Sequence, residues 1–296
     1  MSRGVRGILP LAMVCGLASC ARVLGATRVG SAAPDGTTFH QIAVGRDART
    51  FLMHRAPHLA TLAPVFFILH GTSATANVVM DESGMNRVAD SLGAIVVYPN
   101  GTGGIPYVRL FWNVAGCCSD ASRPNEAAMI RTIVDTIGAH YAIDRTRIGV
   151  AGFSDAGTLA YLLACHDADV ITAIGVISGE VPERACVPQP PVSALVFHGT
   201  ADRNVRYGAT RAHVARWAAG ESCGLAAADT SVALIHDRYA GCAGGAVVEL
   251  YTIRGGKHAW PGGRGSSIFA PHPSRAIDAS RAFAAFTLAH PRPAEH

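Results

Sequence analysis

The stretch Arg147–Cys165, RIGVAGFSDAGTLAYLLAC, constrains the fold more than any other part of the 296-residue chain. Residues 147–153 form a short, mainly apolar run of small and β-branched side chains, which is typical of a buried strand. From Asp155 onward, leucines recur at helical spacing. The stretch therefore predicts a buried strand that turns directly into a helix, with Ser154 at the apex of the turn.

The residues around this apex, GFSDAG over Gly152–Gly157, come close to the G-x-S-x-G pattern of a nucleophile elbow. The serine of an elbow has a strained backbone, and side chains two residues away on either side would crowd the turn. Gly152 meets this requirement, whereas Ala156 stands at the second glycine position and adds one methyl group. A strand that ends in a serine helix cap is the common alternative, so the motif alone leaves both interpretations open.

Length and composition set the bounds for the whole chain. The length suits one large α/β domain or two small ones. Apolar residues make up 49% of the chain and charged residues 16%, which allows a sizeable core and excludes disorder. The net charge of +4 falls to +2 without Arg3 and Arg6. A charge this small gives no reason to expect a nucleic acid or an anionic membrane as partner.

The N-terminus has the features of a targeting segment over residues 1–20. Arg3 and Arg6 precede an apolar run over residues 8–17, which is too short to span a membrane. The run ends in LASC, which resembles a bacterial lipobox in which Cys20 would be lipidated. Cleavage after Ala21 by an ordinary secretory route is the alternative. We expect an exported protein, either secreted or held at a membrane only by this lipid, with a linker over 21–36 and one folded domain over 37–292.

Export affects the interpretation of the cysteines. Beyond the targeting segment the chain has Cys117, Cys118, Cys165, Cys186, Cys223 and Cys242. An even number in an oxidising compartment predicts three disulfides and no free thiol. The adjacent pair Cys117 and Cys118 rarely bond each other because the ring is strained. Partner spacings typical of zinc ligands do not accompany the pair, so we expect no metal.

Hydrophobic patterning predicts alternating strands and helices. Strands are expected over 38–44, 50–54, 64–70, 94–98, 147–153, 172–178, 192–198 and 247–253, and helices over 85–92, 125–141, 207–219 and 276–290 and from 155 onward. The first two strands suit a hairpin at a sheet edge. Alternation of this kind predicts an α/β fold with a mainly parallel central sheet and helices on both faces. The chain has no long apolar insertion that could form a large lid.

Three strands are followed by residues that suit catalysis at their carboxyl ends, where sites form in open α/β sheets. The central strand ends at Ser154, the strand over 192–198 leads into HGTAD with Asp202, and the last strand is followed by GGKH with His258. Their order is that of nucleophile, acid and base in α/β-hydrolases. A serine hydroxyl needs a base, and the imidazole needs a carboxylate. Taken singly, Asp202 suits a turn and His258 an exposed loop, but together they favour a serine hydrolase that needs no cofactor.

An oxyanion hole requires two backbone N–H groups near the serine. One belongs to the residue after the nucleophile, Asp155, and the other to the turn after the strand over 64–70, where Thr72 is preferred over Gly71. The Asp155 carboxylate would oppose a developing oxyanion unless it points away. Substrate-contacting aromatic rings are expected at Trp260, Trp112 and Tyr107, although each alone would suit the core equally well.

Six motifs resemble one known group of enzymes. They are LHGT (69–72), YPNG (98–101), WN followed by GCC (112–118), DRTRIGVAGFS (144–154), HGTAD (198–202) and GGKHAWPGG (255–263). Together they resemble the secreted polyhydroxybutyrate depolymerase and feruloyl esterase group, carbohydrate esterase family 1, which includes lipoproteins of the LpqC type. The resemblance covers roughly residues 65–260 and implies an α/β-hydrolase fold. It implies ester hydrolysis through an acyl-enzyme on Ser154, with Asp202 as acid and His258 as base. It also implies a disulfide Cys223–Cys242, with the other four cysteines forming two more.

The chain departs from the pattern of this group around the acyl site. The group usually has Asn-Gly-Gly after the nucleophile, where this chain has Asp155, Ala156 and Gly157. The expected substrates are polyhydroxybutyrate-type polyesters or oligomers, or feruloyl and acetyl esters of plant polysaccharide, with activity on short p-nitrophenyl esters. Two alternatives are a serine peptidase of the same fold and an inactive surface lipoprotein that serves as a binding module. Asp155 and Ala156 are the best support for the inactive protein.

Overall fold

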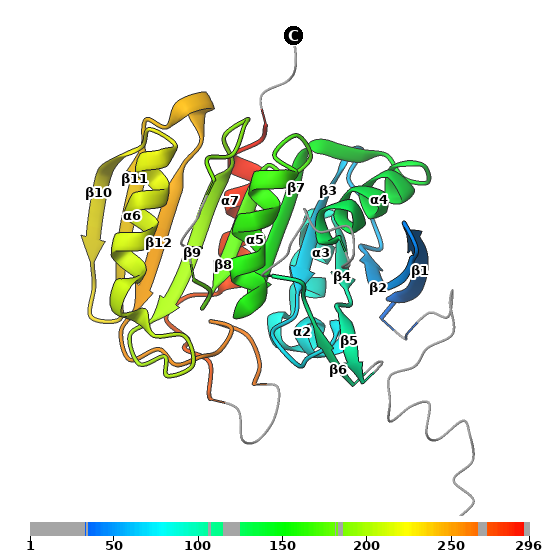
Figure 1. The fold of residues 1–296 in the computed structure, drawn as a ribbon, viewed down its shortest axis with the longest axis horizontal. Coiled ribbons are helices and arrows are strands. Elements are labelled where there is room, and N and C mark those ends of the chain that lie inside the picture. Colours follow the sequence, from blue (N-terminus) through cyan, green and yellow to red (C-terminus); the bar gives the residue numbers. More distant parts are fainter. Residues whose placement is uncertain are drawn as a thin grey trace, which may run out of the picture.

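The computed structural model describes residues 33, 35–105, 108–114, 125–180, 182, 186–265 and 271–292. The predicted targeting segment with Cys20, most of the linker, Tyr107, Cys117 and Cys118 lie outside the described residues. One central sheet runs through the protein, and helices pack on both of its faces (Figure 1). The architecture confirms the predicted α/β fold.

The central sheet has ten strands in the order β1-β2-β4-β3-β7-β8-β9-β12-β11-β10. They are β1 Thr38–Val44, β2 Asp47–Arg55, β3 Ala63–Leu69, β4 Ile95–Pro99, β7 Ile143–Phe153, β8 Ala173–Ile177, β9 Ser193–Gly199, β10 Gly224–Thr230, β11 Leu234–Ala240 and β12 Val248–Ile253. The run from β4 to β12 is parallel. Antiparallel pairs extend it at both edges. A separate ribbon pairs β5, Thr102–Ile105, with β6, Arg109–Phe111.

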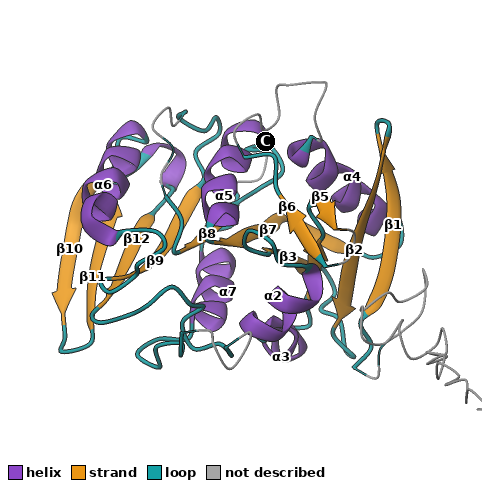
Figure 2. Cartoon of the chain, turned by 60° about the horizontal axis from the view of Figure 1, so that its bottom comes forward, coloured by secondary structure: helices purple, strands orange, loops and turns teal. Residues whose placement is uncertain are grey.

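The α-helices form two layers. They are α2 Ala76–Ser83, α3 Met85–Leu92, α4 Glu126–Gly138, α5 Asp155–His166, α6 Thr210–Gly220 and α7 Ala279–Ala289. Figure 2 shows α4, α5 and α6 on one face of the sheet and α2, α3 and α7 on the other. Because both faces are covered, all seven residues of β3 are buried, as expected for a central parallel strand. Within the described residues no helix has both the length and the apolar character needed to cross a membrane.

Most predicted elements are confirmed to within a few residues, but three features were not predicted. The ribbon of β5 and β6 was missed because its two strands are short and β5, TGGI, has no strand patterning. Helix α2 was missed because it is short and is joined to α3 through a single left-handed glycine, Gly84. The hairpin of β10 and β11 was missed because β10, GLAAADT, is exposed along its whole length and has no apolar alternation. Its pairing comes from backbone hydrogen bonds to β11, which side-chain patterning does not reveal.

A buried carboxylate lies just after α6, beside the Cys223–Cys242 disulfide. Glu221 is 1% exposed, and neither of its oxygens makes a hydrogen bond of ordinary geometry with the described residues. Burial raises the pKa of Glu221 to about 7, and a weak interaction with the backbone of Val192 offsets this only in part. The folded protein therefore holds the proton of Glu221 more tightly than the unfolded chain does.

The raised pKa of Glu221 predicts a loss of stability with rising pH. For this group alone, the free energy of unfolding should fall by about 3 kcal/mol between about pH 4.5 and about pH 7. At higher pH it should stay level. Glu221→Gln should remove that slope, because the amide does not ionise. Urea denaturation at pH 5 and pH 8 measures the difference, with Asp229→Asn on the exposed strand β10 as control. An unchanged slope in Glu221→Gln would contradict the assignment.

Candidate active site

The turn between β7 and α5 presents Ser154. Its backbone has φ 60° and ψ −125°, a left-handed conformation that is strained for any residue with a side chain. The Ser154 N–H donates to the Ile177 carbonyl at 2.9 Å, which ties the turn to β8. A Cβ atom on Gly152 would collide with the backbone of Ala156, so the first glycine of the motif is required. Ala156 is itself fully buried and its methyl group fits.

The turn after β3 packs directly against this elbow. A Cβ atom on Gly71 would lie 3.5 Å from the Cβ of Ser154 and 3.2 Å from the ring of Phe153. The next residue, Thr72, therefore has its backbone close to the serine. The structure thus brings together the two turns from which the sequence predicts the oxyanion-hole donors.

The side chain of His70 holds this turn in place through two hydrogen bonds. Its imidazole is buried, with Nδ1 at 2.8 Å from the Gly71 carbonyl and Nε2 accepting the Gly101 N–H at 3.0 Å. Burial lowers the pKa of His70 to about 4, so the ring is neutral and Nδ1 carries the proton. The indole N–H of Trp112 donates to the His70 carbonyl at 2.6 Å. Sequence analysis assigned no role to this histidine, although it stands inside the LHGT motif.

Asp202 and His258 meet across the ends of β9 and β12, which lie toward the bottom of Figure 1. The Nδ1 atom of His258 lies 2.8 Å from Oδ2 of Asp202, whose side chain is fully buried. The other carboxylate oxygen accepts the N–H groups of Asn204 and Val205 at 2.9 and 3.0 Å. Burial alone would raise the pKa of Asp202, but the hydrogen bonds from His258 and these N–H groups hold it below its usual range. Asp202 is therefore a carboxylate that fixes the orientation of the imidazole.

The imidazole of His258 lies next to the elbow. Its ring centroid is 4.7 Å from that of Phe153, the residue before Ser154, and its side chain remains 11% exposed. A second histidine, His198, steadies the Asp202 loop, because its Nε2 donates to the Val205 carbonyl at 2.9 Å. His198 stands in the HGTAD motif, but the sequence alone gave no reason to expect that this histidine positions the Asp202 loop.

Asp155 directs its carboxylate toward the predicted oxyanion hole. The carboxylate accepts a hydrogen bond from the N–H of Ala156 at 3.0 Å. The hydroxyl and backbone N–H of Thr72 and the Asp155 N–H lie close enough to favour its charged form. Burial raises the pKa of Asp155 above its usual range, although these interactions oppose the shift. The condition that the side chain points away from the site is not met.

Comparison with known families agrees with this geometry. The family model described as Esterase PHB depolymerase matches residues 52–207, which is more than half of the chain. The chain belongs to this family. The resemblance inferred from the six motifs is therefore confirmed.

Relatives of this PHB depolymerase family member include curated esterases and solved structures. Feruloyl esterase B of Piromyces equi is 29% identical over 217 residues, which cover 67% of this chain and 40% of that protein. Poly(3-hydroxybutyrate) depolymerase of Ralstonia pickettii is 32% identical over 126 residues, 39% of this chain and 25% of that protein. The matches thus span less than half the length of these relatives. The acetyl xylan esterase structure from Aspergillus awamori aligns with a TM-score of 0.59 at 13% identity, over 75% of this chain and 94% of that chain, which shows the α/β-hydrolase fold.

Two of the three aromatic residues predicted to contact substrate are buried. Trp260 is 2% exposed, and its indole N–H donates to the Ser280 hydroxyl at 2.9 Å. The expected place for Trp260 at the mouth of the site is therefore wrong. Trp112 is 7% exposed and packs on His70, and its contact with substrate stays a prediction. Tyr107 lies outside the described residues.

Two disulfides occur among the residues that the structure describes. Cys223–Cys242 matches the pair implied by the family resemblance and joins the base of the β10–β11 hairpin to the end of α6. Cys165–Cys186 links the last turn of α5 to the segment before β9. The sequence left the partner of Cys165 open.

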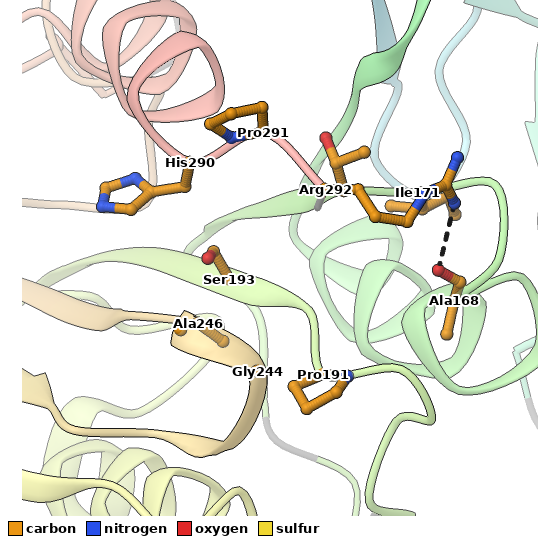
Figure 3. Close-up of a pocket in the computed structure, with 11 residues that line it drawn as sticks. Ala168, Ile171, Pro191, Ser193, Gly244, Ala246, His290, Pro291 and Arg292 are labelled. Carbon is orange, nitrogen blue, oxygen red and sulfur yellow. Dashed lines mark hydrogen bonds between the residues drawn. The ribbon is translucent and has the colours of Figure 1, made fainter. Parts of the chain in front are cut away.

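A small hollow lies at the opposite end of the sheet from Ser154. Its volume is about 30 Å³, and it is bordered by residues that precede β8, β9 and β12 and by the segment after α7. Figure 3 shows the Arg292 side chain beside it, donating to the Ala168 carbonyl at 3.4 Å. Arg292 also donates to the carbonyls of Asp169 and Arg145. These bonds hold the segment after α7 in place. Because the hollow lies at the opposite end of the sheet from Ser154, it is no part of the candidate active site.

Proposed function

We propose that this protein is a serine esterase that hydrolyses carboxylic esters through an acyl-enzyme on Ser154. The observation that carries the proposal is the 2.8 Å hydrogen bond between His258 and the buried Asp202 beside a strained serine elbow. This bond holds the tautomer in which Nε2 can accept a proton. Membership of the PHB depolymerase family supports the same chemistry.

The chain's own residues supply each step of the reaction. His258 Nε2 takes the proton of Ser154 as Oγ attacks the ester carbonyl. The backbone N–H groups of Thr72 and Asp155 stabilise the oxyanion of the tetrahedral intermediate. His258 then returns the proton to the departing alcohol, which leaves the acyl group on Ser154. Water, activated by the same imidazole, attacks the acyl-enzyme and releases the acid.

The proposed substrates are short or aromatic acyl esters and hydroxyacid oligomers. Support comes from relatives whose names are feruloyl esterase B and poly(3-hydroxybutyrate) depolymerase. We also propose that the protein acts outside the cytoplasm, because its disulfides suit an oxidising compartment. Residues 1–20 would direct export, with Cys20 as the lipid attachment site, and residues 37–292 would form the catalytic domain.

A fluorophosphonate probe tests the proposal directly. The mature protein should be labelled at Ser154, and labelling should vanish in Ser154→Ala. A panel of short p-nitrophenyl esters, methyl ferulate, 3-hydroxybutyrate oligomers and peptides then assigns the reaction class. A protein that takes up no probe would be the inactive binding module, and faster cleavage of peptides than of esters would indicate the peptidase.

Removing the charge of Asp155 should raise activity. Its carboxylate lies close to the two N–H groups that should serve the oxyanion, and its negative charge opposes the developing one. We expect Asp155→Asn to raise kcat/KM for p-nitrophenyl acetate about tenfold at pH 8, mainly through kcat. Steady-state kinetics, with circular dichroism as a check on folding, measure the change.

The pH dependence of this gain has a defined sign. Because burial raises the pKa of Asp155, the wild-type carboxyl group is partly neutral at acidic pH and becomes charged as pH rises. The ratio of mutant to wild-type kcat/KM should therefore grow with pH and then level off. Asp155→Ala should show the same trend, since it also removes the charge. A fall in kcat for both folded variants would instead give this carboxylate a role in promoting catalysis.

A further inference from the structure

A cavity of about 210 Å³ lies between α5 and α6, next to the serine elbow. Polar side chains along its wall are those of Thr158, Tyr161, Glu180, Arg206, Thr210 and His213. It adjoins the elbow because the Thr158 N–H lies 3.4 Å from the Ser154 carbonyl. At roughly 30 Å³ per water-sized group, it has room for about seven heavy atoms.

Tyr161 lines this cavity, but its hydroxyl group is buried away from it and has no partner. The side chain is 1% exposed, its ring packs against Trp217 at 4.7 Å, and its hydroxyl has no hydrogen-bond partner among the described residues. Leaving a buried hydroxyl unpaired is costly, and native proteins rarely do so. Burial also raises the pKa of Tyr161, so the group remains an O–H donor.

Two basic side chains face the same space without acidic partners. In the part of the chain that the structure describes, neither Arg206 nor His213 forms an ion pair or hydrogen bond, whereas the nearby Arg211 binds Asp237 through two 2.6 Å contacts. Glu180 is the acidic residue of the wall, and its side chain is exposed to solvent, as is that of Arg206. The backbone N–H of Glu180 donates to the Thr158 hydroxyl at 3.1 Å, which leaves that hydroxyl free to donate in turn.

These groups are hydrogen-bond donors, and one of them carries a permanent positive charge. We propose that the cavity is a subsite for a carboxylate on the ester substrate, bound by Arg206 and His213. The substrate would thus be an ester of a hydroxyacid whose free carboxylate lies a few bonds from the cleaved carbonyl. This inference rests on the proposed esterase function and names its substrate class.

A matched pair of substrates tests the subsite. The linear dimer of 3-hydroxybutyrate as the free acid is compared with its primary amide, which has the same shape and no charge. Charge-assisted hydrogen bonds favour the acid, and we expect its kcat/KM to exceed that of the amide about tenfold or more. The difference should lie mainly in KM and should shrink as salt is added.

Variants at the cavity assign the preference to named groups. Arg206→Ala should reduce the acid-to-amide ratio of kcat/KM to near one, and Arg206→Lys should restore part of it. Arg216→Ala, an exposed arginine of α6 that does not line the cavity, should leave the ratio unchanged. Tyr161→Phe should leave the acid-to-amide ratio unchanged, because the hydroxyl is buried away from the cavity, and the thermal midpoint should stay level or rise.

The outcomes separate the subsite from the esterase itself. Equal kcat/KM for acid and amide in the wild type, or no cleavage of either dimer, would overturn the subsite. An Arg206→Ala variant that lowers kcat/KM equally for the acid and the amide would also overturn the subsite. In each of these cases, Ser154-dependent hydrolysis of p-nitrophenyl acetate would still support the proposed esterase function. If that hydrolysis is absent, the proposed function itself is overturned.

Discussion

Replacing Ser154 or His258 by alanine should lower kcat/KM for p-nitrophenyl acetate on the order of 10³-fold or more. Without the serine hydroxyl no acyl-enzyme forms, and without the imidazole the serine loses its general base. The remaining rate would come from binding and from the oxyanion hole alone. Steady-state kinetics on the purified mature protein measure the loss, and the double variant should be no slower than either single one.

Asp202→Asn should cost somewhat less than loss of the nucleophile or base. The amide can no longer hold the His258 tautomer whose Nε2 accepts the serine proton. Ser231→Ala and His140→Ala, exposed residues away from the site, serve as controls and should keep full activity. Turnover near the wild-type level in a folded Ser154→Ala protein would refute the assignment of the nucleophile.

Breaking the buried ion pair between Arg49 and Glu126 should lower the free energy of unfolding by about 3–5 kcal/mol. The two side chains meet at 2.6 Å with 1% and 0% exposure, on β2 and at the start of α4. In Glu126→Gln the guanidinium is left buried without its counter-charge. Urea denaturation at pH 7 measures the loss.

This ion pair also supports the site. The second oxygen of Glu126 accepts the Asn113 N–H at 3.1 Å, next to Trp112, whose indole holds the His70 carbonyl. Partial loss of esterase activity should therefore accompany the loss of stability. Adding Arg49→Met to Glu126→Gln should recover most of the stability, because no charge is then buried and the amide oxygen can still accept from Asn113.

An exposed ion pair provides the matched control for this prediction. Arg145 and Asp135 lie 3.2 Å apart but are 54% and 65% exposed, so Arg145→Ala should change the free energy of unfolding by no more than about 1 kcal/mol. A loss below about 1 kcal/mol for Glu126→Gln would show that water reaches Arg49. Equal losses for the buried and exposed pairs would contradict the argument from burial.

Features with a local cause were predictable from the sequence. The strand, turn and helix around Ser154 follow from apolar periodicity and from the steric need for glycine at Gly152. The order of Ser154, Asp202 and His258 along the chain, at successive strand ends, was enough to predict that Asp202 and His258 meet. Parallel strands place their carboxyl ends at one edge of the sheet, so residues that follow different strands can meet there.

Only the tertiary structure decided which side chains the site exposes and which it buries. Trp260 looked like a ring at the mouth of the site, but Ser280, on α7, takes its indole N–H and holds it in the core. The Asp155 carboxylate lies beside Thr72, which comes from the distant turn after β3. The unpaired Tyr161 hydroxyl likewise depends on how α5 packs against α6. In each case the partner comes from a distant part of the chain, and periodicity and motif spacing carry no information about such contacts.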